Sequence, residues 1–228
     1  MGKKIQAIIP TAGVGARLKS KTLKSLIEIQ GCPLFIHTLA AFEKSRSIKD
    51  VVLVVHPAHA KVFEKLLKKH KITKVKKIVS GGATRRESVF AGIQALDADT
   101  QIVLVHDGAR ALITPALIDR CVKEAQAQPA LITGVKVKST IKRIDTKTAI
   151  VEETLPRDQL VEVQTPQVFH RDVLVRAHKE SKLKDPSDDA VMVEGLGIAV
   201  KVIEGDYQNI KVTTSEDVQI AKIFLAAR

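Results

Sequence analysis

Short apolar runs alternate with longer amphipathic stretches over the first half of the chain. The runs at residues 5–10, 51–56, 74–80 and 101–106 are predicted strands. In the first, second and fourth of them the apolar residues are consecutive, which indicates strands buried on both faces. The stretches at 34–45, 58–71, 85–96 and 115–127 carry apolar residues at helical spacing. This order predicts an α/β fold in which helices flank a mostly parallel central sheet.

The alternation of strand and helix stops at Gly134. Residues 135–144 alternate apolar and charged side chains, residues 145–148 have the composition of a turn, and residues 149–155 are again typical of a strand. We therefore predict a β-hairpin arm, inserted at 135–157 into a single domain that spans 1–228. Because a two-stranded hairpin is only marginally stable alone, we expect it to lie on a second copy of the chain or, alternatively, on its own domain.

The last third of the chain predicts further helices and one strand. Residues 171–180, 188–195 and 215–226 are expected to be helical, and residues 198–203 form an extended run. Thr213 and Glu216 have capping-box spacing at the start of the closing helix. Thr114 and Pro115 suit the N-cap and the first position of the helix at 115–127.

The chain carries an excess of positive charge. Its 37 Lys and Arg residues exceed its 25 Asp and Glu residues by 12, which favours nucleic acid, membrane surfaces or phosphorylated small molecules as partners. Eight lysines fall within 61–77, where an amphipathic helix with a solvated lysine face competes with a nucleic-acid patch. The expected apolar face of that helix is formed by Val62, Phe63, Leu66 and Leu67. An aromatic content of 3% argues against base stacking on single strands, so we expect no nucleic-acid partner.

The sequence also indicates the compartment. Cys32 and Cys121 belong to no C-x-x-C pair, so we expect two buried thiols in a reducing environment and no metal knuckle. No apolar run approaches the ~18 residues of a membrane span, and the apolar run near the N-terminus is too short for a secretory signal. We therefore expect a cytoplasmic protein without a membrane partner.

A loop of small residues follows the first predicted strand, from Pro10 to Leu18. In an open parallel sheet, ligands bind at the carboxyl ends of the strands. Gly13 and Gly15 would let backbone N–H groups approach phosphate oxygens, and Arg17 could donate to the same oxygens. Two alternatives stay open: a dinucleotide-binding loop, although Leu18 stands where a third glycine is required, and an ordinary strand-to-helix turn.

Together with Lys24, this loop resembles that of nucleotidyltransferases that attach a nucleoside monophosphate to a sugar or polyol phosphate. Five later segments are similar, in order, to motifs of the 2-C-methyl-D-erythritol 4-phosphate cytidylyltransferase family: 81–89 (GGATRRESV), 105–110 (VHDGAR), 165–169 (TPQVF), 187–190 (SDDA) and 209–213 (NIKVT). The resemblance covers nearly the whole chain. It implies a Rossmann-like nucleotidyltransferase domain and a homodimer formed through the arm.

The resemblance also implies a reaction. The chain would transfer CMP from CTP to 2-C-methyl-D-erythritol 4-phosphate and release pyrophosphate in isoprenoid precursor biosynthesis by the non-mevalonate pathway, with Mg²⁺ as cofactor. Ribitol 5-phosphate is the alternative polyol phosphate, because enzymes that use it share much of the framework. Such transfers depend mainly on positioning and charge neutralisation. A nucleic-acid-binding module and an inactive member of the family are the competing hypotheses.

The resemblance further assigns roles to individual residues. The catalytic cations would be Arg17, Lys24 and Lys211. The nucleotide would be held by Thr11, Ala12, Gly13, Gly15, Gly82, Ser88, Asp107 and Ala109. The polyol phosphate would be held by Arg110, Thr140, Arg157, Thr165 and Ser187. In the family, the counterparts of Thr140 and Arg157 arrive from the arm of the neighbouring subunit, and Asp107 would also be a metal ligand.

Some positions depart from the family pattern or receive no role. Gly108 stands where the family usually has Ala, and Ser187 replaces Thr while keeping the hydroxyl. Arg85 and Arg86 are interpreted as a surface pair at a helix N-terminus, without a catalytic role. The seven histidines show no metal-binding spacing, and we expect them to be packing or surface residues.

Overall fold

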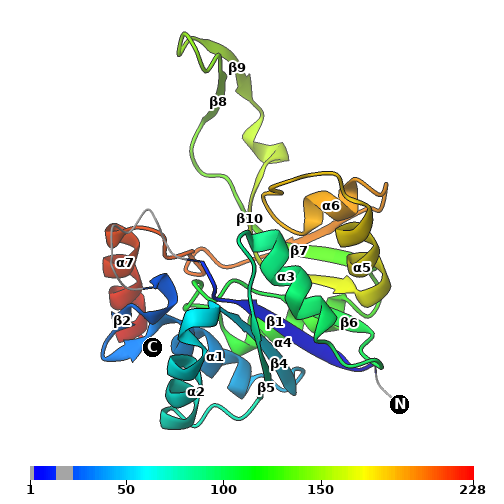
Figure 1. The fold of residues 1–228 in the computed structure, drawn as a ribbon. Helices are drawn as coiled ribbons and strands as arrows, with labels where there is room; N and C mark the ends of the chain where they lie inside the picture. Colours follow the sequence, from blue (N-terminus) through cyan, green and yellow to red (C-terminus); the bar gives the residue numbers. More distant parts are fainter. Residues whose placement is uncertain (1–2, 14–22) are drawn as a thin grey trace.

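A seven-stranded sheet forms the centre of the protein (Figure 1). The computed structural model describes residues 3–13 and 23–228. The strand order across the sheet is β11 (Lys201–Glu204), β7 (Ala130–Lys136), β10 (Val161–His170), β6 (Ile102–Val105), β1 (Ile5–Pro10), β4 (Asp50–Val55) and β5 (Val75–Ser80). Only β10 runs antiparallel to its neighbours β6 and β7 within this described sheet. The predicted α/β fold with a mostly parallel sheet is therefore confirmed.

Two layers of helices cover the sheet. One layer consists of α1 (Leu34–Lys44), α2 (Ala60–Lys69) and α4 (Pro115–Glu124), which pack with Ala7 and Ile9 of β1 in one apolar core. The other consists of α3 (Arg85–Gln94), α5 (Arg171–Glu180) and α6 (Ala190–Glu194), which pack with Ile8 in a second core. Successive residues of β1 thus enter opposite cores, which explains its unbroken apolar run.

The closing helix α7 (Ser215–Ala226) covers a small third core. It packs beside the two-stranded sheet of β2 (Glu28–Ile29) and β3 (Cys32–Pro33), where Ile29, Leu34 and Ala221 are buried. Three short 3₁₀ helices, η2 (Lys24–Leu26), η3 (Pro57–His59) and η4 (Arg157–Gln159), complete the described chain. None of the described helices combines the length and apolar character that crossing a bilayer requires.

The periodicity predicted most of these elements correctly. The first strand and the helices at 171–180 and 215–226 have the expected bounds, and Thr114 caps α4 by accepting from Leu117 N–H. The capping box of α7 is formed by Thr214 and Asp217, one residue later than predicted. The predicted strand at 198–203 begins later, at residue 201.

The largest difference lies around the predicted arm. Residues 135–144 are not one strand, because β7 in the central sheet extends to Lys136 and the arm strands β8 (Ile141–Ile144) and β9 (Val151–Leu155) follow. The arm projects from the body and does not fold back on its own domain (Figure 1). Strand β10 was not predicted, because Gln164, Thr165 and Gln167 are polar residues buried within it and Pro166 interrupts the pattern.

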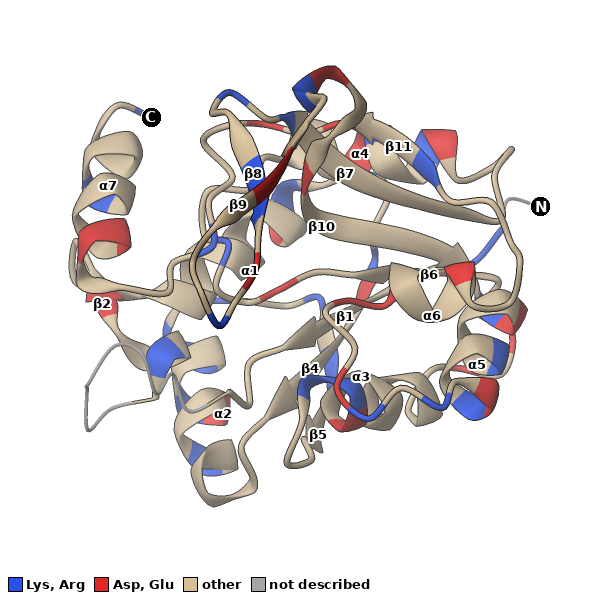
Figure 2. Ribbon diagram, turned by 90° about the horizontal axis from the view of Figure 1, so that it is seen from above, with Lys and Arg blue, Asp and Glu red and all other residues tan. Residues whose placement is uncertain are grey.

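The first half of the lysine-rich segment 61–77 forms the predicted amphipathic helix, α2, whereas Lys76 and Lys77 lie in β5. Phe63 and Leu67 of α2 are buried, and Figure 2 shows basic residues along this helix. The expected apolar face is wrong at Val62, which is 44% exposed. Both cysteines are free thiols; Cys121 is buried as expected, whereas Cys32 is only half-buried.

We predict that Gly92→Ala destabilises the protein. Gly92 brings α3 so close to β1 that an added Cβ would lie 2.5 Å from Ile8 Cγ2. Overpacking of this kind costs about 1–3 kcal/mol of unfolding free energy, more than the helix propensity of Ala returns. Urea denaturation measures the change. The matched control is Gly195→Ala, whose added Cβ meets nothing closer than 3.4 Å; equal stability of the two variants would contradict the close contact of α3 and β1.

Candidate active site

A pocket of about 340 Å³ opens at the carboxyl ends of β1, β4 and β6. In the sheet, β1 lies between β4 and β6. The chain adds β4 and β5 on one side of β1 and then crosses to the other side, where it adds β6. Helices leave the sheet on opposite faces at such a switch point, and the crevice between them accepts ligands. The pocket is lined by Pro10, Thr11, Ala12, Gly13, Lys24, Ser25, His56, Gly82, Ala83, Thr84, Arg85, Ser88, Asp107, Gly108, Ala109 and Lys211.

One wall of the pocket is the N-terminus of α3 and the two glycines before it. Thr84 caps the helix by accepting from Glu87 N–H, and Glu87 Oε2 accepts from Ala83 N–H at 2.6 Å. An added Cβ at Gly82 would lie 2.4 Å from Glu87 Cβ, and one at Gly81 would lie 2.6 Å from Ala12 Cβ. The two glycines therefore allow close packing against Ala12 and Glu87, and the wall that lines the pocket is formed by Gly82, Ala83, Thr84, Arg85 and Ser88 at the start of α3. The positive end of a helix dipole lies there, which favours an anion nearby.

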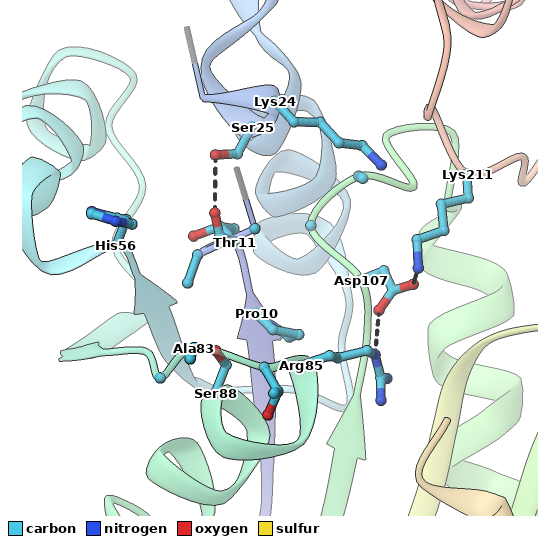
Figure 3. Close-up of a pocket in the computed structure, with 16 residues that line it drawn as sticks. Pro10, Thr11, Lys24, Ser25, His56, Ala83, Arg85, Ser88, Asp107 and Lys211 are labelled. Carbon is cyan, nitrogen blue, oxygen red and sulfur yellow. Dashed lines mark hydrogen bonds and ion pairs between the residues drawn. The ribbon is translucent and has the colours of Figure 1, made fainter. Parts of the chain in front are cut away.

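Asp107 is the carboxylate of the pocket, and it lies between two cations. Lys211 Nζ lies 2.7 Å from Oδ2, and Arg85 Nε lies 3.3 Å from Oδ1 (Figure 3). Burial by itself would raise the pKa of Asp107, but the charges of Arg85 and Lys211 hold it well below its ordinary value. Asp107 is therefore a carboxylate at neutral pH.

The second lysine of the pocket comes from η2. Ser25 Oγ donates to the carbonyl of Thr11 at 3.2 Å, and Thr11 Oγ1 donates to the carbonyl of Val54 at 2.7 Å, so η2 is tied to the ends of β1 and β4. Figure 3 shows Lys24 and Lys211 extending from two sides toward the space next to Asp107. Two of the three predicted catalytic cations thus share one pocket. The third, Arg17, lies outside the described residues, as does Gly15.

Thr165 fixes the backbone behind Asp107. Its Oγ1 accepts from Asp107 N–H at 3.0 Å and lies 3.0 Å from His106 Nδ1. Because the hydroxyl oxygen already accepts, its own proton can be donated to Nδ1, and His106 Nε2–H then faces the carbonyl of Arg110 at 3.4 Å. Burial lowers the pKa of His106 to about 4, which fits this neutral ring.

The structure separates the predicted residues into two groups. The described residues predicted for the nucleotide all line the pocket, as Thr11, Ala12, Gly13, Gly82, Ser88, Asp107 and Ala109. Those predicted for the polyol phosphate do not line it. Arg110 is buried and donates to the carbonyls of Asn209 and Val163, Thr140 and Arg157 are exposed in or beside the arm, and Ser187 is exposed before α6.

Two pocket residues with ionisable side chains, Arg85 and His56, received no site role in the sequence analysis. Arg85 is not a surface residue, since its side chain is only 21% exposed and contacts both Asp107 and Asp189. The sequence feature that could have indicated a site role is the position of Arg85 in the first turn of α3, shortly after Gly81 and Gly82. His56, at the end of β4, also lines the pocket. Across the described residues, no three His, Cys, Asp or Glu side chains form a cluster able to hold a metal ion.

Position 108 has no room for a side chain. An added Cβ would lie 2.4 Å from Thr11 Cγ2. Thr11 cannot rotate away without losing its hydrogen bond to Val54. Glycine at position 108 is therefore required by the residue across the pocket floor.

We predict that His106 makes the protein sensitive to mild acid. Its folded pKa of about 4 lies below the ordinary value of 6.5, so between these values the unfolded chain binds a proton that the folded chain does not. Stability therefore falls as the pH falls, by about 1–2 kcal/mol from pH 6.5 to 5. Urea unfolding of the parent and of His106→Gln at both pH values measures this loss, which should be much smaller in the variant. Parallel losses in the two proteins would assign the effect to other groups.

Comparisons with known proteins identify the family to which the chain is similar. A family described as 2-C-methyl-D-erythritol 4-phosphate cytidylyltransferase matches residues 5–227. The protein of that name from Alkaliphilus metalliredigens is 42% identical over 231 residues, covering 100% of this chain and 95% of the relative. Its counterpart in Geobacillus kaustophilus is 42% identical over 225 residues, covering 98% and 97%.

Solved structures show the same relationship. The 4-diphosphocytidyl-2C-methyl-D-erythritol synthase of Anaerococcus prevotii superimposes with a TM-score of 0.87 at 32% identity, covering 99% of this chain and 100% of the other. The cytidylyltransferase of Thermus thermophilus superimposes with a TM-score of 0.77 at 28% identity, covering 99% and 100%. The resemblance seen in the sequence motifs is confirmed over the full length, and the chain belongs to the 2-C-methyl-D-erythritol 4-phosphate cytidylyltransferase family.

Proposed function

We propose that the pocket binds CTP and that the protein transfers CMP to 2-C-methyl-D-erythritol 4-phosphate, as a cytoplasmic homodimer with Mg²⁺. Family membership supports the reaction. The observation that carries it to this site is that Lys24 and Lys211 line one pocket together with Asp107 and the N-terminus of α3. The two lysines suit the negative charge of a triphosphate.

The reaction is an in-line substitution at phosphorus. A phosphate oxygen of the polyol substrate attacks the α-phosphorus of CTP, a new P–O–P bond forms, and the bond to the β-phosphate breaks to release pyrophosphate. No general base is needed, because the attacking phosphate monoester is already ionised at neutral pH. The obstacle is repulsion between two polyanions, which Lys24, Lys211 and Arg17 would reduce.

Asp107 is the proposed ligand of Mg²⁺. Mg²⁺ commonly uses one or two protein carboxylates together with water and substrate phosphates, so a single carboxylate in the described lining fits this ion. When bound, the ion would neutralise part of the charge of the phosphate groups. Lys211 Nζ lies 2.7 Å from Asp107 Oδ2, so we expect Lys211 to move toward the phosphates when Oδ2 binds the ion.

The arm is the proposed dimerisation element. Its strands leave Ile144, Ile150 and Val151 between 45% and 66% exposed, which favours burial against a second copy. Thr140 and Arg157 lie outside the pocket of their own chain. In a dimer with crossed arms, they would supply the polyol phosphate site of the partner subunit.

Lys24→Ala should lower kcat/KM by at least about 10²-fold, the loss typical for one donor that stabilises the transition state. Pyrophosphate release from CTP and 2-C-methyl-D-erythritol 4-phosphate is the assay. Lys61→Ala, on the exposed side of α2, is the matched control and should keep the parental rate. Parental activity in Lys24→Ala would refute the proposed site, and turnover with ribitol 5-phosphate in place of the erythritol substrate would change the polyol assignment.

Crossed arms predict that two inactive variants restore activity when mixed. Lys24→Ala damages the pocket and Arg157→Ala damages the arm, so each homodimer lacks complete sites. After subunit exchange, a mixed dimer has one intact site, and an equimolar mixture should regain about a quarter of the parental activity. Light scattering of each variant checks that dimers persist. No recovery after demonstrated exchange would mean that the arm serves its own subunit.

A further inference from the structure

A series of four ionisable side chains in contact runs from the pocket into the second apolar core. Asp107 Oδ1 lies 3.3 Å from Arg85 Nε, and Arg85 Nη1 lies 2.8 Å from Asp189 Oδ2. Asp189 Oδ1 in turn lies 3.0 Å from His178 Nε2. The members come from four elements: the loop after β6, α3, the residue before α6, and α5. None of these residues was given a role in the sequence except Asp107.

The inner members of this series, Asp189 and His178, are packed on all sides. The side chains of Asp189 and His178 are both 0% exposed. Asp189 N–H donates to Gln167 Oε1 at 3.1 Å, and the His178 ring stacks on Phe90 with planes 15° apart. A buried carboxylate that loses its partner is strongly destabilising, so Asp189 keeps Arg85 in place. The charge of Arg85 and the hydrogen bond from His178 hold the pKa of Asp189 below its ordinary value, although burial alone would raise it.

The two cations on Asp107 are therefore held very differently. Arg85 is 21% exposed and is shared between two carboxylates, one of them inside the core. Lys211 is 38% exposed and reaches Oδ2 from the open pocket. An arriving triphosphate offers Lys211 a stronger anionic partner, whereas the departure of Arg85 would remove the cation that pairs with the buried carboxylate of Asp189.

We propose that Arg85, fixed by Asp189 and His178, is a positioning residue that keeps Asp107 in its reactive orientation while Lys211 moves to the phosphates. This inference rests on the proposed function, because it assigns Lys211 and Asp107 to the triphosphate. Asp189 and His178 act only through Arg85. Their effect should appear in the chemical step and hardly in the affinity for CTP.

The test compares Arg85→Gln, Asp189→Asn and the double variant. Each single change should lower kcat by about 10–100-fold, the range typical of residues that orient a functional carboxylate from behind. The dissociation constant for CTP, measured by calorimetry, should change less than about 3-fold. If Asp189 acts through Arg85, the double variant is no slower than Arg85→Gln alone. The matched control is Glu180→Gln, which breaks the exposed Arg176–Glu180 pair of α5 and should leave kcat unchanged.

Two results would overturn the proposal: parental kcat in Asp189→Asn, or a double variant whose loss is the product of the single losses. Arg85→Lys keeps one positive charge but cannot bridge two carboxylates, so it should show a similar loss in kcat. It is the second variant in case Asp189→Asn folds poorly, and the melting temperature of each variant is measured to show that it is folded under the assay conditions. Parental kcat in Arg85→Lys would also refute the proposal. Failure of the proposed function is distinguishable, because the unaltered protein would then release no pyrophosphate.

Discussion

The burial of one carboxylate organises the site. Asp107 lies at the end of a buried strand, where an uncompensated negative charge would cost several kcal/mol. Arg85 and Lys211 meet that requirement from two different segments, and in doing so they line the same crevice with positive charge. The ion pairs that stabilise the buried carboxylate thus also place two positive charges where phosphate groups would bind.

The sheet topology brings these groups together. Pro10 is the last residue of β1, His56 follows β4 and Asp107 lies just beyond β6; parallel strands with the same direction end at the same edge of the sheet. Lys211 reaches this edge from the segment before α7, where Val212 N–H donates to the carbonyl of Ala109 at 2.9 Å. This backbone hydrogen bond positions the main chain of Lys211 beside the pocket, and the lysine side chain then reaches Asp107.

Local patterns in the sequence were sufficient for the elements that bury apolar residues on a regular period. They failed at β10, where Gln164, Thr165 and Gln167 occupy half of the six buried positions, because hydrogen bonds rather than apolar contacts satisfy these residues. The motifs predicted Lys24, Lys211 and Asp107 correctly as pocket residues. They could not predict the role of Arg85, because its partner Asp189 is far away in the sequence and pairing of two distant charges leaves no periodic signal.

The contact between Thr11 and Gly108 bears on how this chain can change over time. The methyl group of Thr11 fills the volume that a Cβ at position 108 would need. The Thr11 hydroxyl donates to the Val54 carbonyl, and this hydrogen bond fixes the side-chain rotamer and therefore the methyl group. Alanine can enter position 108 only after a smaller residue has replaced Thr11. The two positions therefore constrain each other, and a substitution at position 11 must come before a substitution at position 108.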